Sequence, residues 1–78
     1  MGGKKGVIAN HMKRIRLART DLTQAELARR IGATRQTVLA IEAERYAPSL
    51  ELAFRIAYVL ETPLTEVFVF DPKTMNND

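Results

Sequence analysis

The sequence predicts a small all-α domain. Its 78 residues are enough for one domain, and apolar residues recur at three- and four-residue spacing, which is typical of helices with one buried face. Residue pairs typical of helix starts, such as Thr23 with Glu26, separate these apolar stretches. The predicted domain spans residues 12–70.

The first eleven residues lack a helical pattern. Residues 1–11 contain three glycines and show no period, so we interpret them as a flexible arm or as a leader foreign to the natural chain. From Met12 onward, apolar residues recur among four cations, which predicts a short basic helix as far as about Arg19.

Two short helices are then predicted to meet at a tight turn. Thr23 and Glu26 form a capping box at the start of the first helix, which ends at Gly32. Thr34 is placed to cap a second helix from Arg35 to about Ala43. The side chains expected to pack inward from the two helices are Leu27, Ile31, Val38 and Ile41.

The last third of the chain predicts a densely apolar helix and a short one. Ser49 is a candidate N-cap for the helix that follows and ends near Leu60. Thr62 suits the cap of a last helix that starts at Pro63 and runs to about Val67. Residues 71–78 are expected to form a frayed tail.

The charges are unevenly distributed. Residues 1–45 hold ten Lys or Arg against four acids, whereas residues 46–78 hold two against five. Clustered cations release counterions from nucleic-acid phosphates, so the basic half suits a nucleic-acid partner, although a solvated surface would look the same on charge alone.

Other function classes find little support in the composition. The chain has no cysteine and one histidine, so we expect no metal and no cofactor. It offers neither a nucleophile paired with a base nor a glycine-rich phosphate loop, and we therefore expect no enzyme activity. With no apolar run of membrane-spanning length and no secretory signal, no membrane partner is expected and the expected compartment is the cytoplasm.

The run LTQAELARRIGATRQTVLAIEAERYAPSLELAFRIAYVL, residues 22–60, resembles the phage-repressor and Cro type of helix-turn-helix family, in particular its short xenobiotic response element-like regulators. The resemblance implies a compact five-helix repressor-like domain that places one helix in the major groove of double-stranded DNA. It also implies a homodimer on a palindromic operator, with Gln24 holding a phosphate. A further implied pair joins Glu42 to an arginine of the first helix, for which Arg19 is the candidate, and Gly32 forms the turn.

The second helix of the motif provides the candidate DNA-reading surface. If Val38 and Ile41 face inward, a turn of about 100° per residue directs the opposite side outward. The predicted base-reading residues are Arg35, Gln36, Leu39 and Ala40, and the predicted phosphate contacts, besides Gln24, are Thr34, Thr37 and Arg45, with Arg14 and Arg16 as further candidates. Leu39 can equally be read as a core residue.

The family commonly has Asn-Gly where this chain has Ala43-Glu44. An acidic side chain directed toward the DNA would repel phosphate, so this departure puts in doubt the contact between this loop and the DNA backbone.

The end of the domain provides a candidate dimer interface. The run Val67, Phe68, Val69 and Phe70 is apolar and is expected to pair with its two-fold mate as a short strand or to pack as a patch. Alternatively, Phe68 and Val69 close the core of the monomer. A repressor is the simpler form of regulator, because repression requires only occupancy of a promoter. The competing hypothesis is an antitoxin or another protein-interaction module with the same fold.

Overall fold

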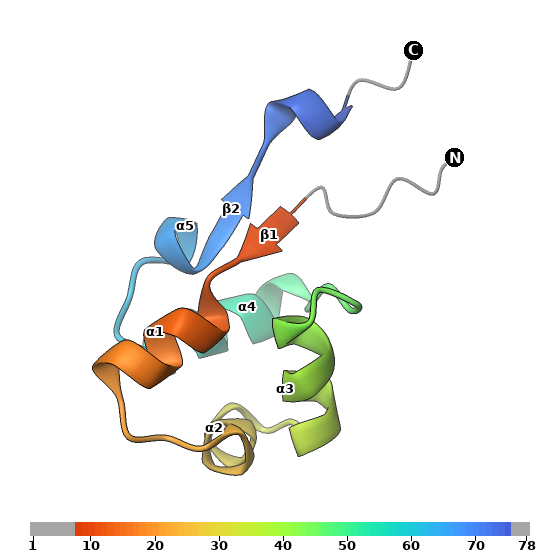
Figure 1. Ribbon diagram of the computed structural model, residues 1–78. Helices are drawn as coiled ribbons and strands as arrows, with labels where there is room; N and C mark the ends of the chain where they lie inside the picture. Colours follow the sequence, from red (N-terminus) through yellow and green to blue (C-terminus); the bar gives the residue numbers. More distant parts are fainter. Residues whose placement is uncertain (1–7, 76–78) are drawn as a thin grey trace.

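The structure, a computed structural model, describes residues 8–75 and contains five α-helices, a two-stranded sheet and a terminal 3-10 helix (Figure 1). In chain order the elements are β1 (Ile8–Asn10), α1 (Met12–Arg19), α2 (Gln24–Ile31), α3 (Arg35–Glu42), α4 (Leu50–Val59), α5 (Leu64–Val67), β2 (Phe68–Phe70) and η1 (Pro72–Met75). The helical part of the predicted fold is therefore confirmed. Across these residues, no helix combines the length and the apolar character needed to cross a bilayer.

Three of the predicted helix caps are present. Thr23 Oγ1 accepts a hydrogen bond from the Glu26 backbone N–H at 3.0 Å, and the Glu26 carboxylate accepts one from the Thr23 N–H at 2.8 Å. The hydroxyls of Thr34 and Ser49 each accept a hydrogen bond from the backbone N–H three residues later. Because each cap satisfies an amide that has no partner inside its helix, the caps fix where α2, α3 and α4 begin.

The predicted cap of α5 at Thr62 is wrong. Pro63 occupies the N-cap position, makes no side-chain cap bond, and is followed by Leu64 as the first helical residue. Thr62 is buried, and its hydroxyl donates to the Leu60 carbonyl at 2.9 Å. This hydroxyl therefore satisfies the end of α4 and leaves the start of α5 uncapped.

The core forms where the helices meet. The four side chains predicted to point inward from α2 and α3 are all fully buried, namely Leu27, Ile31, Val38 and Ile41. Ile56 and Leu60 extend the same cluster from the region of α4, while Met12 and Val67 close it from α1 and α5. Residues from both ends of the chain thus contribute to one core.

The turn between α2 and α3 depends on Gly32. This residue has φ 76°, in the left-handed region that L side chains adopt only at a cost. A Cβ at this position would also lie 3.0 Å from the guanidinium of Arg55. The Arg55 Nη1 donates to the Ile31 carbonyl at 3.1 Å, so a cation from α4 satisfies the end of α2.

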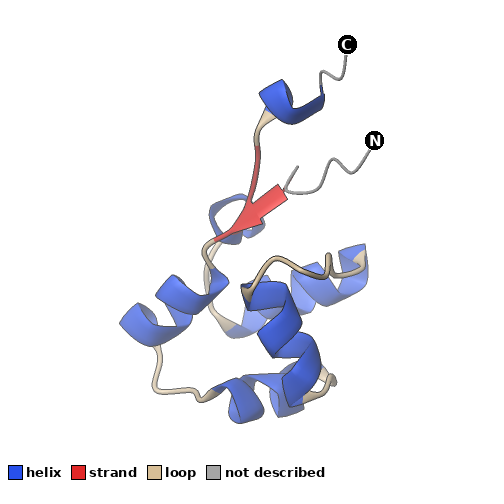
Figure 2. Cartoon of the chain, turned by 45° about the vertical axis from the view of Figure 1, so that its right-hand side comes forward, coloured by secondary structure: helices blue, strands red, loops and turns tan. Residues whose placement is uncertain are grey.

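Strands β1 and β2 pair antiparallel, with Ile8 opposite Phe70 and Asn10 opposite Phe68. The pairing continues into the helices, because the His11 backbone N–H donates to the Val67 carbonyl at 2.8 Å. Figures 1 and 2 show the sheet at the end of the molecule opposite α2. The expectation of a flexible arm is therefore wrong for residues 8–11, and its remainder, residues 1–7, lies outside the described residues.

The carboxyl-terminal run divides into buried and exposed residues. Val67 is fully buried in the core of the monomer, so its predicted place at a dimer interface is wrong. Phe68 is half-buried against the core, whereas Val69 and Phe70 are 39% and 49% exposed. The expected frayed tail is wrong for residues 72–75, which form η1, and residues 76–78 lie outside the described part of the chain.

The positive φ angles of Gly32 and Glu61 predict that substitutions at these two residues have opposite effects on stability. Gly32→Ala should lower the free energy of unfolding by about 1 kcal/mol, because alanine is strained in the left-handed region. Glu61 has φ 51° without glycine, so Glu61→Gly should raise stability by a few tenths to about 1 kcal/mol. Urea denaturation of both variants and the parent chain tests this, and a neutral Gly32→Ala would contradict it.

Candidate nucleic-acid interface

The exposed side of α3 carries the residues expected to read DNA. Because Val38 and Ile41 are fully buried, the opposite side of the helix faces outward. Arg35 and Gln36 are exposed, and Leu39 and Ala40 are half-buried. Leu39 is not among the half-buried side chains that pack against the core, so the structure does not support its interpretation as a core residue.

The start of α2 presents hydrogen-bond donors beside α3. The capping box occupies the Thr23 and Glu26 backbone N–H groups. No described group accepts a hydrogen bond from the N–H of Gln24 or Ala25. The backbone hydrogen bond from Thr23 is the main reason that the pKa of Glu26 is lowered, with the Thr23 hydroxyl as the next cause. Two backbone donors at the positive end of a helix are therefore available for an anion.

A shallow hollow joins the start of α2 to the start of α3. Its lining comes mainly from the end of α1 and the α1–α2 link, which contributes the acid Asp21, and is completed by Gln24 and Ala25 from α2 and Arg35 from α3. Two residues predicted from sequence to touch DNA, Gln24 and Arg35, thus line the same hollow although they lie eleven positions apart. An anion in this hollow would lie within reach of both helix starts.

The two threonines of α3 are connected to each other. Besides capping the Thr37 N–H, the Thr34 hydroxyl lies 3.0 Å from the Thr37 hydroxyl. Thr34 is exposed and Thr37 half-buried, and this places both hydroxyls at the first turn of α3. Their predicted phosphate contacts remain predictions.

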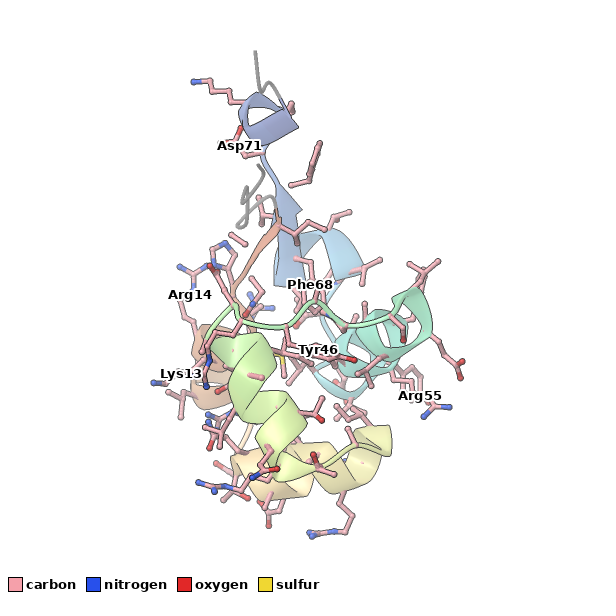
Figure 3. All side chains as sticks on the ribbon, turned by 90° about the vertical axis from the view of Figure 1, so that its right-hand side faces the viewer. Lys13, Arg14, Tyr46, Arg55, Phe68 and Asp71 are labelled. Carbon is pink, nitrogen blue, oxygen red and sulfur yellow. The ribbon has the colours of Figure 1, made fainter. Side chains whose placement is uncertain are left out.

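Exposed cations surround these helices. Arg29, Arg30, Arg35 and Arg45 are exposed, and none of them forms an ion pair with a described residue. Figure 3 looks onto α3, and Lys13 and Arg14 of α1 project past one side of it. Arg35 and Arg45 flank α3 and share this side of the molecule with Lys13 and Arg14, whereas Arg29 and Arg30 line a hollow with residues of α4.

Glu44 is directed away from this basic surface. It takes the left-handed conformation, with φ 61°, at the position where the family commonly has glycine. Its carboxylate accepts a hydrogen bond from the Asn10 backbone N–H at 3.1 Å. The acidic side chain is thus held at the end of β1. Arg45, which follows it, is exposed.

The expected pair between Arg19 and Glu42 is wrong. Glu42 pairs with Arg16, whose Nε lies 2.9 Å from Glu42 Oε2, and both side chains are buried. Arg19 lies on another side of α1, where its Nη1 donates to Thr62 Oγ1 at 3.1 Å and lies 3.8 Å from Glu66. Arg16 is also excluded as a free phosphate contact. The sequence contains one indication that Arg16 is the buried partner of Glu42: it lies four residues after the core residue Met12, on the same face of the helix.

Asn10 is a residue that the sequence analysis did not single out. Its side-chain amide donates to the Ile41 carbonyl at 2.8 Å, and its Oδ1 accepts from the Met12 N–H at 3.2 Å. The side chain therefore caps α1 and at the same time holds the last turn of α3. A lone asparagine in an apolar and glycine-rich segment gives no sequence signal for this role.

The pairing of Arg16 predicts a difference between two arginines of α1. Arg16→Met leaves the buried Glu42 carboxylate unpaired and should lower the free energy of unfolding by about 3–5 kcal/mol. Arg19→Met removes an exposed ion pair with Glu66 and a part-buried hydrogen bond to Thr62, whose hydroxyl keeps its bond to the Leu60 carbonyl, and should cost about 1 kcal/mol. Thermal and urea denaturation followed by circular dichroism compares them; equal losses would disprove the assignment.

The comparisons with known proteins agree with this geometry. A family model described as helix-turn-helix matches residues 12–67. An HTH-type transcriptional regulator of Methanothermobacter thermautotrophicus is 46% identical over 66 residues, which cover 83% of this chain and 88% of the relative. Another, from Archaeoglobus fulgidus, is 40% identical over 58 residues, covering 74% and 82%. The regulator YgzD of Bacillus subtilis is 42% identical over 59 residues, covering 76% and 88%.

All three relatives are named as uncharacterised HTH-type transcriptional regulators. The matched region begins with α1 and ends with α5, so it includes the turn at Gly32 and both helices of the motif. The chain therefore belongs to the Cro/C1-type helix-turn-helix family.

Proposed function

We propose that this protein is a transcriptional repressor that binds a palindromic DNA operator as a homodimer and has no enzymatic activity or cofactor. One observation carries the proposal: the exposed start of α3, with Arg35 and Gln36, adjoins the free amides at the start of α2 across one hollow. Sequence-specific binding requires two parts: side chains that reach base edges, and donors that hold a phosphate. Here the two lie next to each other. Its compartment is then the cytoplasm, with the DNA.

Direct reading of bases is assigned to α3. The Arg35 guanidinium has the fork geometry that pairs with guanine, and the Gln36 amide can pair with adenine. Leu39 offers an apolar contact to a thymine methyl, and Ala40 allows close approach of the helix to the groove. The half-buried state of Leu39 and Ala40, beside exposed Arg35 and Gln36, supports a reading surface of few positions.

Phosphate binding is assigned to the residues around the reading helix. Gln24 and the adjacent backbone amides bind one phosphate at the start of α2. Thr34 and Thr37 share one hydrogen bond between their hydroxyls at the start of α3, so one hydroxyl hydrogen of the pair is left to donate to phosphate, and Arg45 follows the end of α3. These contacts position α3 in the groove without carrying sequence information.

The dimer interface is assigned to an apolar groove beside the sheet. The groove has a volume of about 520 Å³ and is lined mainly by apolar side chains from both strands, the α3–α4 loop, α4 and α5. Ile8, Tyr46, Leu50 and Phe70, which line it, are each between 46% and 70% exposed. Phe68 also lines the groove, and Val69 lies next to it in β2. A second copy would cover these side chains and place two reading helices on successive turns of DNA.

Selection of binding sites from random duplex DNA tests the reading function. We expect the parent chain to enrich a palindrome, and Gln36→Ala to lose about 1–3 kcal/mol of discrimination at one position of each half-site. Tyr58→Ala, an exposed change on α4, is the control and should leave the selected sequence unchanged. If the parent chain binds DNA without sequence preference, and salt abolishes this binding, α3 does not read bases. The protein would then be better explained as a protein-interaction module.

Sedimentation at several protein concentrations tests the dimer. We expect the parent chain to associate and Phe70→Glu to shift it to the monomer, because the charge would be buried in the groove. Phe54→Glu is the matched control, since Phe54 is 55% exposed and lies outside the groove. A parent chain that stays monomeric at all concentrations contradicts the proposed dimer.

A further inference from the structure

We propose that Glu42, a buried acid at the end of α3, is a positioning residue for phosphate binding and raises the affinity for DNA through Gln24. The inference rests on the proposed function, in which Gln24 holds a phosphate. It adds a residue that touches no DNA itself. Its consequence is unusual for a protein that binds a polyanion, because removal of a negative charge should then weaken binding.

The contacts of the Glu42 carboxylate carry the inference. Oε2 accepts a hydrogen bond from Arg16 Nε at 2.9 Å, and Oε1 accepts one from Arg16 Nη2 at 3.3 Å. The same Oε1 accepts a third hydrogen bond, from Gln24 Nε2 at 3.0 Å. One carboxylate from α3 thus holds an arginine of α1 and the first residue of α2.

The arginine of this network also fixes the backbone that leads into α2. Arg16 Nη1 donates to the Leu22 carbonyl at 3.1 Å, two residues before Gln24. The side chains of Arg16 and Glu42 are only 7% and 4% exposed, so their geometry is set by packing as well as by charge. Both the backbone before Gln24 and the side chain of Gln24 are therefore tied to one buried ion pair.

This arrangement determines which end of the Gln24 amide faces Glu42. A carboxylate accepts hydrogen bonds only, so the NH₂ group must face Glu42 and the carbonyl oxygen must turn away. The second Nε2–H remains available, beside the free backbone amides of Gln24 and Ala25. The three donors are already ordered before DNA arrives, which removes part of the entropy cost of binding.

The charge of Glu42 does not oppose this role. Its two oxygens are both bonded to the Arg16 guanidinium, so the pair is neutral as a unit. The exposed carboxylate of Glu61 forms no ion pair with a described residue, and removal of its charge should strengthen or leave unchanged the attraction to phosphate. The sign of the effect therefore separates positioning from simple electrostatics.

Dissociation constants for the selected operator, measured at several salt concentrations, test the inference. We expect Glu42→Gln to weaken binding about tenfold, the equivalent of one charge-assisted hydrogen bond to phosphate. Its salt dependence should stay close to that of the parent chain, because Gln24 and the backbone amides are uncharged donors that release no counterion from phosphate. Glu61→Gln is the matched control, because Glu61 is exposed and its carboxylate forms no ion pair within residues 8–75; it should bind as tightly as the parent chain or more tightly.

A double-mutant cycle separates positioning from a general loss of structure. In the Gln24→Ala background, Glu42→Gln should change the dissociation constant less than about twofold, since the residue that Glu42 positions is gone. Glu42→Asp is the second variant: the shorter acid keeps its charge for Arg16 but withdraws from Gln24, and it should also weaken binding. Circular dichroism at the assay temperature establishes that each variant is folded.

Two results would overturn the inference. If Gln24→Ala weakens binding while Glu42→Gln binds like the parent or better, Glu42 has no positioning role and the proposed function stands. If the effects of Gln24→Ala and Glu42→Gln are additive, Glu42 acts through something other than Gln24. A Gln24→Ala variant that binds normally would instead remove the phosphate contact from the proposed function, and the inference with it.

Discussion

The buried ion pair between Arg16 and Glu42 is the interaction on which the arrangement of the first three helices depends. Two charges removed from water require each other and further hydrogen bonds, because an unpaired ion in the core is costly. Here a further donor of the guanidinium, Nη1, bonds to the Leu22 carbonyl, and the carboxylate accepts from Gln24. The requirement to satisfy both ions therefore fixes α1, the link after it, the start of α2 and the end of α3 relative to one another.

A second set of polar contacts holds the same end of α3 from the strand side. The Asn10 amide donates to the Ile41 carbonyl and accepts from the Met12 N–H at the start of α1, while the Glu44 carboxylate accepts a hydrogen bond from the Asn10 backbone N–H. Helix α3 is thus held at its last turn both by residues next to the sheet and by the buried ion pair. Since so small a domain has few buried apolar side chains, these directional bonds set the orientation of α3 more sharply than packing alone.

Much of the fold could be predicted because its signals are local. The caps at Thr23, Thr34 and Ser49 and the turn at Gly32 depend on neighbours within a few residues, and helical spacing identified the buried face of α3. Contacts between distant segments could not be predicted. The pairing of residues 8–10 with β2 joins two three-residue strands too short to show alternation.

For the candidate site, the residues that face outward could be predicted from the sequence. The hydrogen bonds that hold those residues in place could not. Exposed Arg35 and Gln36 follow from the helical period, whereas the bond from Gln24 to Glu42 spans eighteen positions and depends on how α2 crosses α3. Arg16, and not Arg19, pairs with Glu42 because Arg16 lies on the buried face of α1, four residues after Met12. The pairing of β1 with β2 also has a consequence for synthesis. Strand β1 has no backbone partner until the ribosome has reached residues 68–70, so the sheet can form only after the five helices between the strands have been translated.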